Sequence, residues 1–376
     1  TVSEGEILTA ANDDTIDSVA DLAGKTTAQS STSNWADVAA EAGANVEAVE
    51  GFVQAVTLVK DGRVDATVND SLAIAEYLAQ TGDTGVEVAA QTGDTSYQAF
   101  AARQDSGLMG EIDAAIDTLQ ADGTLAQISE RYFGSDIAAP TADTQAPTAD
   151  DTSAGAESKF DLILSNLWPM LKATVTMTIP LTAISFAVGL VIALGVALAR
   201  ISSNTVLSAV SRFYVSVIRG TPLLLQLFIV FYALPQLGVV IDPFPAAVVA
   251  FSLNVGGYAA EVIRAAILSV PKGQWEASQT IGMGYRTTLQ RIILPQALRT
   301  AVPPLSNTLI SLVKDTSLAS TILVTELLRT AQLAAAPTFD FFALYSVAAV
   351  YYWVICLVLS FFQGKLEVRL DRYVAT

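Results

Sequence analysis

Histidine is absent from the 376 residues, and there is a single cysteine. The first absence excludes imidazole metal ligands and His-based catalytic triads, and the second excludes an internal disulfide and a Cys-cluster metal site. Cys356 lies in an apolar run and is expected to be a small buried hydrophobe. No cluster of catalytic side chains is visible, so we predict no catalytic residues, no metal site and no cofactor bound to this chain.

The sequence also begins without Met and without the basic and apolar segments of a signal peptide. We therefore interpret the chain as a processed protein or a fragment, and the domain organisation below favours a fragment.

Acidic charge is plentiful but unevenly distributed. Residues 1 to 158 contain 5 Lys and Arg against 28 Asp and Glu, whereas residues 159 to 376 contain 15 against 9. The chain has 52% apolar residues and a net charge of −17. Such a composition predicts two environments, an acidic soluble part and a very apolar, weakly basic part. The acidic part is expected to be mostly a solvated surface, with no nucleic-acid partner.

Residues 1–136 alternate short strand patterns with helical ones, which is typical of an α/β domain. Strands are predicted at Glu6–Ala10, Val64–Asn69, Val86–Ala90 and Tyr97–Ala101, and a long helix at Leu108–Tyr132. The following segment, 137–159, is rich in Pro, Thr, Ala and Asp and contains a near-repeat of Ala-Pro-Thr-Ala-Asp. It is predicted to be a flexible linker to the apolar domain, residues 160–376.

Charge-free intervals in the apolar part predict membrane spans, because a bilayer core of about 30 Å needs about 20 helical residues. Four intervals are long enough: Ala173–Ala199, Gly220–Ile241, Pro243–Ala260 and Phe341–Gly364. A fifth candidate, Thr300–Val313, is the fourth span in chain order and is short. Either this helix stops early or the pair Lys314 and Asp315 lies at membrane depth. The prediction is an all-α domain of five spans.

Basic residues in short loops set the orientation of such a domain. With five spans, the three basic groups around Arg200, Arg286 and Arg369 fall on one side, which is predicted to be the cytoplasm. The C-terminus and the loop Gly273–Pro295 would then be cytoplasmic, and the acidic N-terminal domain extracytoplasmic.

The loop Gly273–Pro295 reads GQWEASQTIGMGYRTTLQRIILP. Glu276, Ala277, Gly282 and the terminal Ile-x-Leu-Pro295 resemble the EAA loop of ABC importer permeases, with Ser278 in place of the family's usual Ala. A short helix around Trp275–Ile281 is expected, ended by Gly282, then a second helix approaching Pro295. The plainer alternative is an ordinary helical hairpin between spans.

The resemblance covers nearly all of residues 160–376 and is to polar amino-acid permeases of the histidine and glutamine type. The other matching segments are Arg219-Gly-Thr-Pro-Leu-Leu, Tyr258-Ala-Ala-Glu261, Leu294-Pro-Gln-Ala-Leu-Arg299 and Lys314-Asp-Thr-Ser-Leu318. It implies a type I ABC transporter membrane domain in the bacterial inner membrane that pairs with a second permease subunit, in a homodimer. It also implies that ATP and Mg act on a separate dimeric ATPase, which presses on Glu276, Ala277, Gly282 and Pro295.

A phosphate-binding loop is not expected in this chain. Gly24-Lys25-Thr26 lacks the earlier glycine that such a loop requires, since Val19 stands at that position. We interpret it as a turn that leads into a strand.

Residues 1–136 resemble the second lobe and terminal helix of a family 3 solute-binding protein. The resemblance rests on Asp17–Lys25, Gly62–Asp70 and Asp122-Gly-Thr-Leu with Tyr132-Phe-Gly. It implies that Ser31, Thr32 and Ser33 contact the ligand carboxylate and that Asp70 binds its α-ammonium. An ordinary helix cap for the hydroxyls and a solvated turn for Asp70 remain open. Lobe one is missing, so the fragment is not expected to bind ligand tightly.

Charged residues in the apolar domain come in pairs: Glu261 with Arg264, Lys314 with Asp315, and Glu326 with Arg329. Mutual neutralisation is one interpretation. The other is a substrate pathway near the short fourth span, lined by Asn307, Thr308 and Asp315. The balanced charge favours a zwitterionic side chain such as glutamine, with glutamate or a basic amino acid open.

These observations predict the fused binding and membrane subunit of an ATP-driven amino-acid importer, not an enzyme. The main alternative is an amino-acid-gated channel or a membrane sensor, because binding-protein lobes also occur in receptors.

Overall fold

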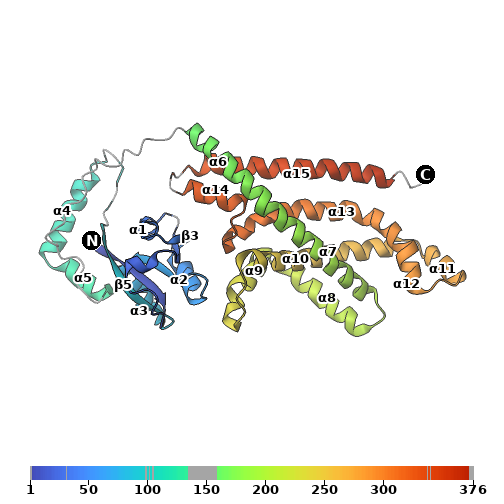
Figure 1. The fold of residues 1–376 in the computed structure, drawn as a ribbon, viewed down its shortest axis with the longest axis horizontal. Helices are drawn as coiled ribbons and strands as arrows, with labels where there is room; N and C mark the ends of the chain where they lie inside the picture. The colour runs from blue at the N-terminus through green and yellow to red at the C-terminus, as the bar shows by residue number, and fades with distance from the viewer. Residues whose placement is uncertain are drawn as a thin grey trace. The chain divides into compact units, whose positions relative to one another are not determined.

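The computed structural model describes residues 2–30, 32–97, 100, 102–103, 106–133, 159–336, 338 and 340–371. The chain divides into two compact units, Thr1–Ala156 and Glu157–Thr376 (Figure 1). An α/β unit therefore precedes a helical one, as the sequence predicted. The predicted linker, 137–159, lies outside the described residues except for Lys159.

A five-stranded sheet forms the N-terminal unit, in the order β3-β2-β4-β1-β5. Its strands are β1 Val2–Ala10, β2 Thr26–Ser30, β3 Asn45–Val49, β4 Ala66–Asp70 and β5 Val86–Tyr97. β2 runs parallel to β3 and β4, while β1 is antiparallel to β4 and β5. The parallel pair β2 and β4 places two strand ends at one edge of the sheet.

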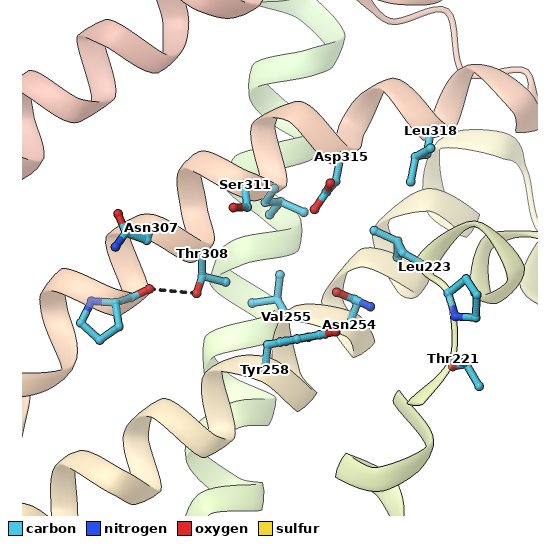
Figure 2. Close-up of a pocket in the computed structure, with 13 residues that line it drawn as sticks. Thr221, Leu223, Asn254, Val255, Tyr258, Asn307, Thr308, Ser311, Asp315 and Leu318 are labelled. Carbon is cyan, nitrogen blue, oxygen red and sulfur yellow. Dashed lines mark hydrogen bonds between the residues drawn. The ribbon is translucent and has the colours of Figure 1, made fainter. Parts of the chain in front are cut away.

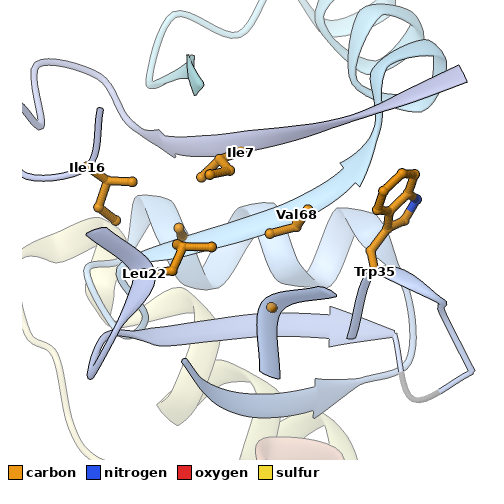
Figure 3. Packing of buried hydrophobic residues seen from close by; sticks show 7 residues of the cluster. Ile7, Ile16, Leu22, Trp35 and Val68 are labelled. Atoms are coloured by element: carbon orange, nitrogen blue, oxygen red, sulfur yellow. The ribbon is translucent and has the colours of Figure 1, made fainter. Parts of the chain in front are cut away.

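Five helices complete this unit. They are α1 Trp35–Glu41, α2 Phe52–Lys60, α3 Ser71–Thr81, α4 Leu108–Ala121 and α5 Thr124–Phe133, with a 3₁₀ turn at Val19–Leu22. Gly24, at φ +77°, precedes β2, so the predicted turn into a strand is confirmed. A core of Ile7, Ile16, Leu22, Trp35, Ala39, Ala66 and Val68 packs between the sheet and these elements (Figure 3).

Three local predictions for this unit differ from the structure. β3 was not among the predicted strands. The predicted strand Val86–Ala90 is longer, because β5 continues to Tyr97, and the predicted strand Tyr97–Ala101 lies partly outside the described residues. The predicted helix Leu108–Tyr132 is broken, because Gly123 adopts φ +77° between α4 and α5.

Among the described residues of the helical unit, three helices are long and apolar enough to cross a membrane, Lys159–Ile201, Pro243–Ser269 and Phe341–Leu370. Two bent pairs pass the same test together, Thr205–Gly220 with Leu223–Ala233 at 107° and Tyr285–Ile322 with Leu327–Ala335 at 49°. Five spans result if each bent pair counts as one.

The helices of this unit follow one another with short breaks (Figure 1). They are α6 Lys159–Ala173, α7 Ile179–Ile201, α8 Thr205–Gly220, α9 Leu223–Phe228, α10 Pro243–Ser269, α11 Lys272–Thr280, α12 Tyr285–Thr288, α13 Leu294–Asp315, α14 Leu327–Ala335 and α15 Phe341–Asp371. 3₁₀ turns lie at Pro235–Leu237 and Thr316–Ile322. Cys356 lies in α15 and is half-buried, not fully buried as expected.

Three π-helical turns, Thr174–Thr178, Ile229–Ala233 and Leu289–Ile293, each lie two residues or fewer before a proline. The prolines are Pro180, Pro235 and Pro295. A proline has no amide hydrogen and its ring crowds the carbonyl four residues earlier, so a widened turn lets the helix continue. The second helix of the loop, which was predicted to approach Pro295, continues through it into α13.

The structure decides the form of two predicted spans. Gly220–Ile241 is not one straight helix, because the chain turns at Thr221 and Pro222. For the fourth span, the alternative of a helix that stops early is excluded, because α13 includes Lys314 and Asp315 and is followed directly by a 3₁₀ turn that ends at Ile322.

Close packing holds α7, α8 and α10 together. A Cβ added to Gly189 of α7 would lie 2.6 Å from the Val255 side chain, and one added to Gly256 of α10 would lie 2.7 Å from Ile192. The Tyr214 hydroxyl on α8 also donates a hydrogen bond to the Leu253 carbonyl, at 2.6 Å. Small residues at such crossings let helices approach in a membrane, where the hydrophobic effect does not drive association.

Candidate functional site

A cavity of about 440 Å³ lies between α10, α13 and the break that separates α8 from α9 (Figure 2). It is lined by Thr221, Pro222, Leu223, Asn254, Val255, Tyr258, Pro304, Asn307, Thr308, Ser311, Leu312, Asp315 and Leu318. The volume is of the order of known small-molecule sites, which begin at about 300 Å³.

One face of α13 supplies the polar wall of this cavity. Thr308, Ser311 and Asp315 are three or four residues apart, so they lie along one side of the helix, and Asn307 lies next to Thr308 (Figure 2). The Thr308 hydroxyl donates to the Pro304 carbonyl at 3.0 Å. The structure thus brings the three predicted pathway residues, Asn307, Thr308 and Asp315, to one cavity, together with Ser311, which sequence reasoning missed.

The buried side chain of Gln226 makes hydrogen bonds across the break between α8 and α9. Its amide nitrogen donates to the carbonyl of Ile218 at 2.8 Å and to the Thr221 hydroxyl at 2.9 Å, and its oxygen accepts from Asn254 at 3.1 Å. Backbone groups freed by a helix break need such partners at membrane depth. This network fixes the Thr221 wall of the cavity against α10.

Asn254 and Tyr258 of α10 also line the cavity and were not predicted. Their spacing of four residues within a charge-free apolar span was the signal that could have indicated them. The Tyr258 ring lies 5.4 Å from the Arg219 guanidinium carbon, a cation–π distance.

The charged pairs of the helical unit differ in their contacts. Glu261 forms ion pairs with Arg264, at 3.1 Å, and with Arg200 of α7. Glu326 is fully buried and accepts from the Arg329 amide at 2.7 Å and from the Tyr352 hydroxyl at 2.6 Å. Glu326 therefore acts as a helix cap of α14, a role that the sequence pairing did not suggest.

The loop predicted for coupling folds as α11, a turn and α12. Gly282 adopts φ +76° directly after α11. The Gly282 amide donates to Gln279 at 2.9 Å and the Met283 amide to Ser278 at 3.0 Å, which is a Schellman end. The predicted short helix ended by Gly282 is confirmed.

This loop is packed, not loose. Trp275 and Ile292 contact a cluster of Ala266, Ile267, Val270, Leu289, Ile293, Ala297 and Ala301, contributed by α10, α13 and the preceding π turn. Ser278 is 1% exposed and its hydroxyl donates to the Gln274 carbonyl at 2.6 Å. α11 and the start of α13 therefore pack against the same cluster.

The outer surface of the loop remains exposed. Glu276, Ala277, Gly282 and Pro295 are all exposed, and Ile281 is 72% exposed.

In the N-terminal unit, the predicted ligand residues lie at the carboxyl ends of the adjacent parallel strands β2 and β4. Thr32 is exposed, and the Ser33 hydroxyl accepts from the Trp35 amide at 3.3 Å, a local turn contact. The N-cap of α1 is Asn34, which makes no side-chain capping hydrogen bond. Ser31 lies outside the described residues.

Asp70 ends β4 and is half-buried. One carboxylate oxygen accepts from the Ser3 hydroxyl and the other from Trp35 Nε1 at 3.2 Å. These contacts differ from the alternative in which Asp70 is only a solvated turn acid. Nowhere in the described part of the chain do three or more His, Cys, Asp or Glu gather as a metal site would require.

Comparison with known proteins shows which family the helical unit resembles. The family described as binding-protein-dependent transport system inner membrane component matches residues 189–372. The L-cystine transport system permease protein of Bacillus subtilis (strain 168) is 58% identical over 222 residues, which is 59% of this chain and 95% of that protein.

Two further similarities agree. The glutamine transport system permease protein of Escherichia coli (strain K12) is 40% identical over 211 residues, covering 55% of this chain and 96% of that protein. A crystal structure of an amino acid ABC transporter matches with a TM-score of 0.50 and 34% identity, covering 56% of this chain and 94% of that chain. The chain therefore belongs to the family of binding-protein-dependent transport system inner membrane components, the permease subunits of ABC transporters, which are not enzymes.

Proposed function

We propose that this chain is the fused binding and membrane subunit of an ATP-driven amino-acid importer. The observation that carries the proposal is the connection between the exposed loop and the cavity. The loop Gly273–Pro295 leads through a π turn directly into α13, and α13 supplies Thr308, Ser311 and Asp315 to the cavity wall.

The mechanism follows from this connection. A separate ATPase dimer contacts the surface around Glu276, Ala277 and Ile281 and, on closing with ATP, displaces α11. Because Trp275 and Ile292 pack into the same cluster as the start of α13, the displacement reaches the cavity. Two copies of the permease would place two cavities about a shared pathway, and the substrate would pass along Asn307, Thr308 and Asp315.

The N-terminal unit would deliver the amino acid. Asp70 is proposed to bind the α-ammonium, and Thr32 and Ser33, with Ser31, the carboxylate. For the substrate, the relative with 58% identity transports L-cystine and the relative with 40% identity transports glutamine. The higher identity favours L-cystine, while the charged pairs of the helical unit, each with one acidic and one basic residue, favour a zwitterion of either kind.

Uptake in proteoliposomes tests the proposal. The full-length protein that contains this chain would be reconstituted with its cognate ATPase and supplied with labelled L-cystine, glutamine, glutamate and arginine, as wild type and as Glu276→Lys. We expect ATP-dependent uptake in the wild type, and loss of uptake with ligand binding retained in the variant. ATP-independent flux that is unchanged by the substitution would instead support an amino-acid-gated channel.

The orientation is proposed from the basic loops, with Arg286 and Lys365 cytoplasmic and the acidic unit outside. An impermeant thiol reagent tests it on Ile281→Cys in a Cys356→Ser background. We expect the introduced cysteine to be labelled only in inside-out vesicles. Labelling in intact cells, from the outside, would show that the orientation is the opposite one.

A further inference from the structure

We propose that Trp35 and Ser3 are positioning residues that hold the Asp70 carboxylate ready for the ammonium group of an amino acid. This inference rests on the proposed binding role of the N-terminal unit and names two residues of that site which the sequence motifs do not include. It follows from how three strands and one helix converge at the end of β4.

Each oxygen of the Asp70 carboxylate has its own neutral donor. Ser3 Oγ donates to Oδ1, and Trp35 Nε1 donates to Oδ2 at 3.2 Å. A carboxylate oxygen can accept two hydrogen bonds, so neither of these two donors by itself prevents a contact between Asp70 and a ligand. Both donors are uncharged, so they orient the carboxylate without adding a positive charge that would compete with an ammonium.

The two donors are themselves immobilised. Trp35 is 1% exposed and Ser3 is 3% exposed. Figure 3 shows Trp35 at one end of the buried cluster, opposite Ile16. A group that must be held within a fraction of an ångström needs such supporting residues, because its own side chain can rotate.

Gly5 makes the space for the indole. It is the cross-strand partner of Asp70, and a Cβ built on it would lie only 2.3 Å from Trp35 Cζ3. The absent side chain lets the indole pass β1 and reach the carboxylate.

Trp35 also contacts both parts of the proposed binding site, the turn for the ligand carboxylate and the acid for its ammonium group. Trp35 is the first residue of α1, directly after the hydroxyl turn, and its own amide donates to the Ser33 hydroxyl at 3.3 Å. Its indole meanwhile reaches Asp70 on β4. One residue therefore sets the distance between the turn proposed for the carboxylate and the acid proposed for the ammonium.

The test compares amino acids with their analogues that lack the ammonium group, by calorimetry on the full-length protein that contains this chain. The probes are L-cystine against 3,3′-dithiodipropionic acid, and L-glutamine against glutaramic acid. The variants are Trp35→Phe, which keeps an aromatic ring, Ser3→Ala and Asp70→Asn. Val68→Ala is the control, because Val68 belongs to the same core cluster but carries no polar group.

The wild type and Val68→Ala are expected to prefer the ammonium-bearing ligand to the same extent. Trp35→Phe should reduce that preference roughly tenfold, as expected when one hydrogen bond to a charged group is lost, and Ser3→Ala by a similar or smaller factor. Affinity for the analogue should change little, since it makes no contact with Asp70.

Equal losses for ligand and analogue in both variants, as in a loosened fold, would overturn the inference. Failure of the proposed function is distinguishable, because Asp70→Asn would then leave the preference for the ammonium unchanged. Loss of preference in Asp70→Asn with none in Trp35→Phe and Ser3→Ala would retain the site and reject the positioning role.

Discussion

Trp275 stacks on Tyr285 across the turn of the exposed loop, with ring centroids 5.7 Å apart and 22° between the ring planes. Trp275 belongs to α11, and Tyr285 begins the helix that leads to the cavity. The two rings therefore join the part of the loop proposed to contact the ATPase to the part that moves α13.

Removing this stack should separate ATP hydrolysis from transport. Trp275→Ala is expected to lower uptake roughly fivefold while the ATPase subunits still hydrolyse ATP, because aromatic pairs contribute about 1 kcal/mol beyond their buried area. Trp275→Phe is the control and should retain most uptake. Equal uptake per ATP in Trp275→Ala and wild type would contradict the coupling role.

Gly282 provides a test of the loop's geometry alone. Its φ of +76° favours glycine, and nothing lies within 4 Å of an added Cβ. Gly282→Ala should therefore cost about 1 kcal/mol through backbone strain only. Gly273→Ala, in α11 with equally open surroundings, is the matched control and should be neutral.

The measurement for this pair is the affinity of the ATPase for the reconstituted permease. We expect the ATPase to associate severalfold more weakly with Gly282→Ala than with the wild type. Its affinity for Gly273→Ala should be unchanged. A loss of the same size in both variants would show that the turn geometry is not what the ATPase requires.

Filling the cavity should block translocation but not coupling. Thr308→Phe places a ring in the 440 Å³ space, so we expect uptake to fall at least tenfold with ATP hydrolysis retained. Ile310→Phe, two residues along α13 and outside the cavity lining, is the control. Uptake that survives in Thr308→Phe would place the pathway elsewhere.

Low pH should reduce the stability of the N-terminal unit around Asp83. A hydrogen bond from Lys60, then hydrogen bonds from Tyr77 and the Gly85 amide, lower the pKa of Asp83 to about 2. The Lys60 ammonium lies 2.7 Å from its oxygen. Because the folded pKa is depressed below the ordinary value, the stabilisation is present above about pH 4 and is lost as pH falls through about 2.

Hydrogen exchange at pH 5 and pH 2.5 measures this effect in residues 71–97. Protection in the wild type should fall between the two pH values, and Asp83→Asn should remove about 1 kcal/mol at pH 5 and flatten the dependence. Asp14→Asn, at an exposed turn, serves as the control. A wild-type pH dependence retained in Asp83→Asn would assign it to another group.

The sequence predicted the α/β unit, the helical unit and the exposed loop because each rests on a local pattern. Charge-free intervals locate apolar helices, and Gly282 marks a helix end. The polar face of α13 was partly found for the same reason, since Asn307, Thr308 and Asp315 stand out within an apolar segment.

What the sequence could not predict depends on contacts between distant residues. At the turn of Thr221 and Pro222, Gln226 satisfies the freed backbone carbonyls and is itself held by Asn254, 28 residues further along the chain. The Asp70 contacts depend on Ser3, which is 67 residues away. Neither pairing leaves a periodic signal in one segment.

The cap at Glu326 has a consequence for biogenesis. Its carboxylate is fully buried in the helical unit, and one of its partners, Tyr352, lies 26 residues further along in the last helix. A carboxylate at membrane depth without a donor is costly. We therefore expect α14 to settle into its final position only after the last helix has left the ribosome, so that insertion and final assembly of this unit are separate steps in time.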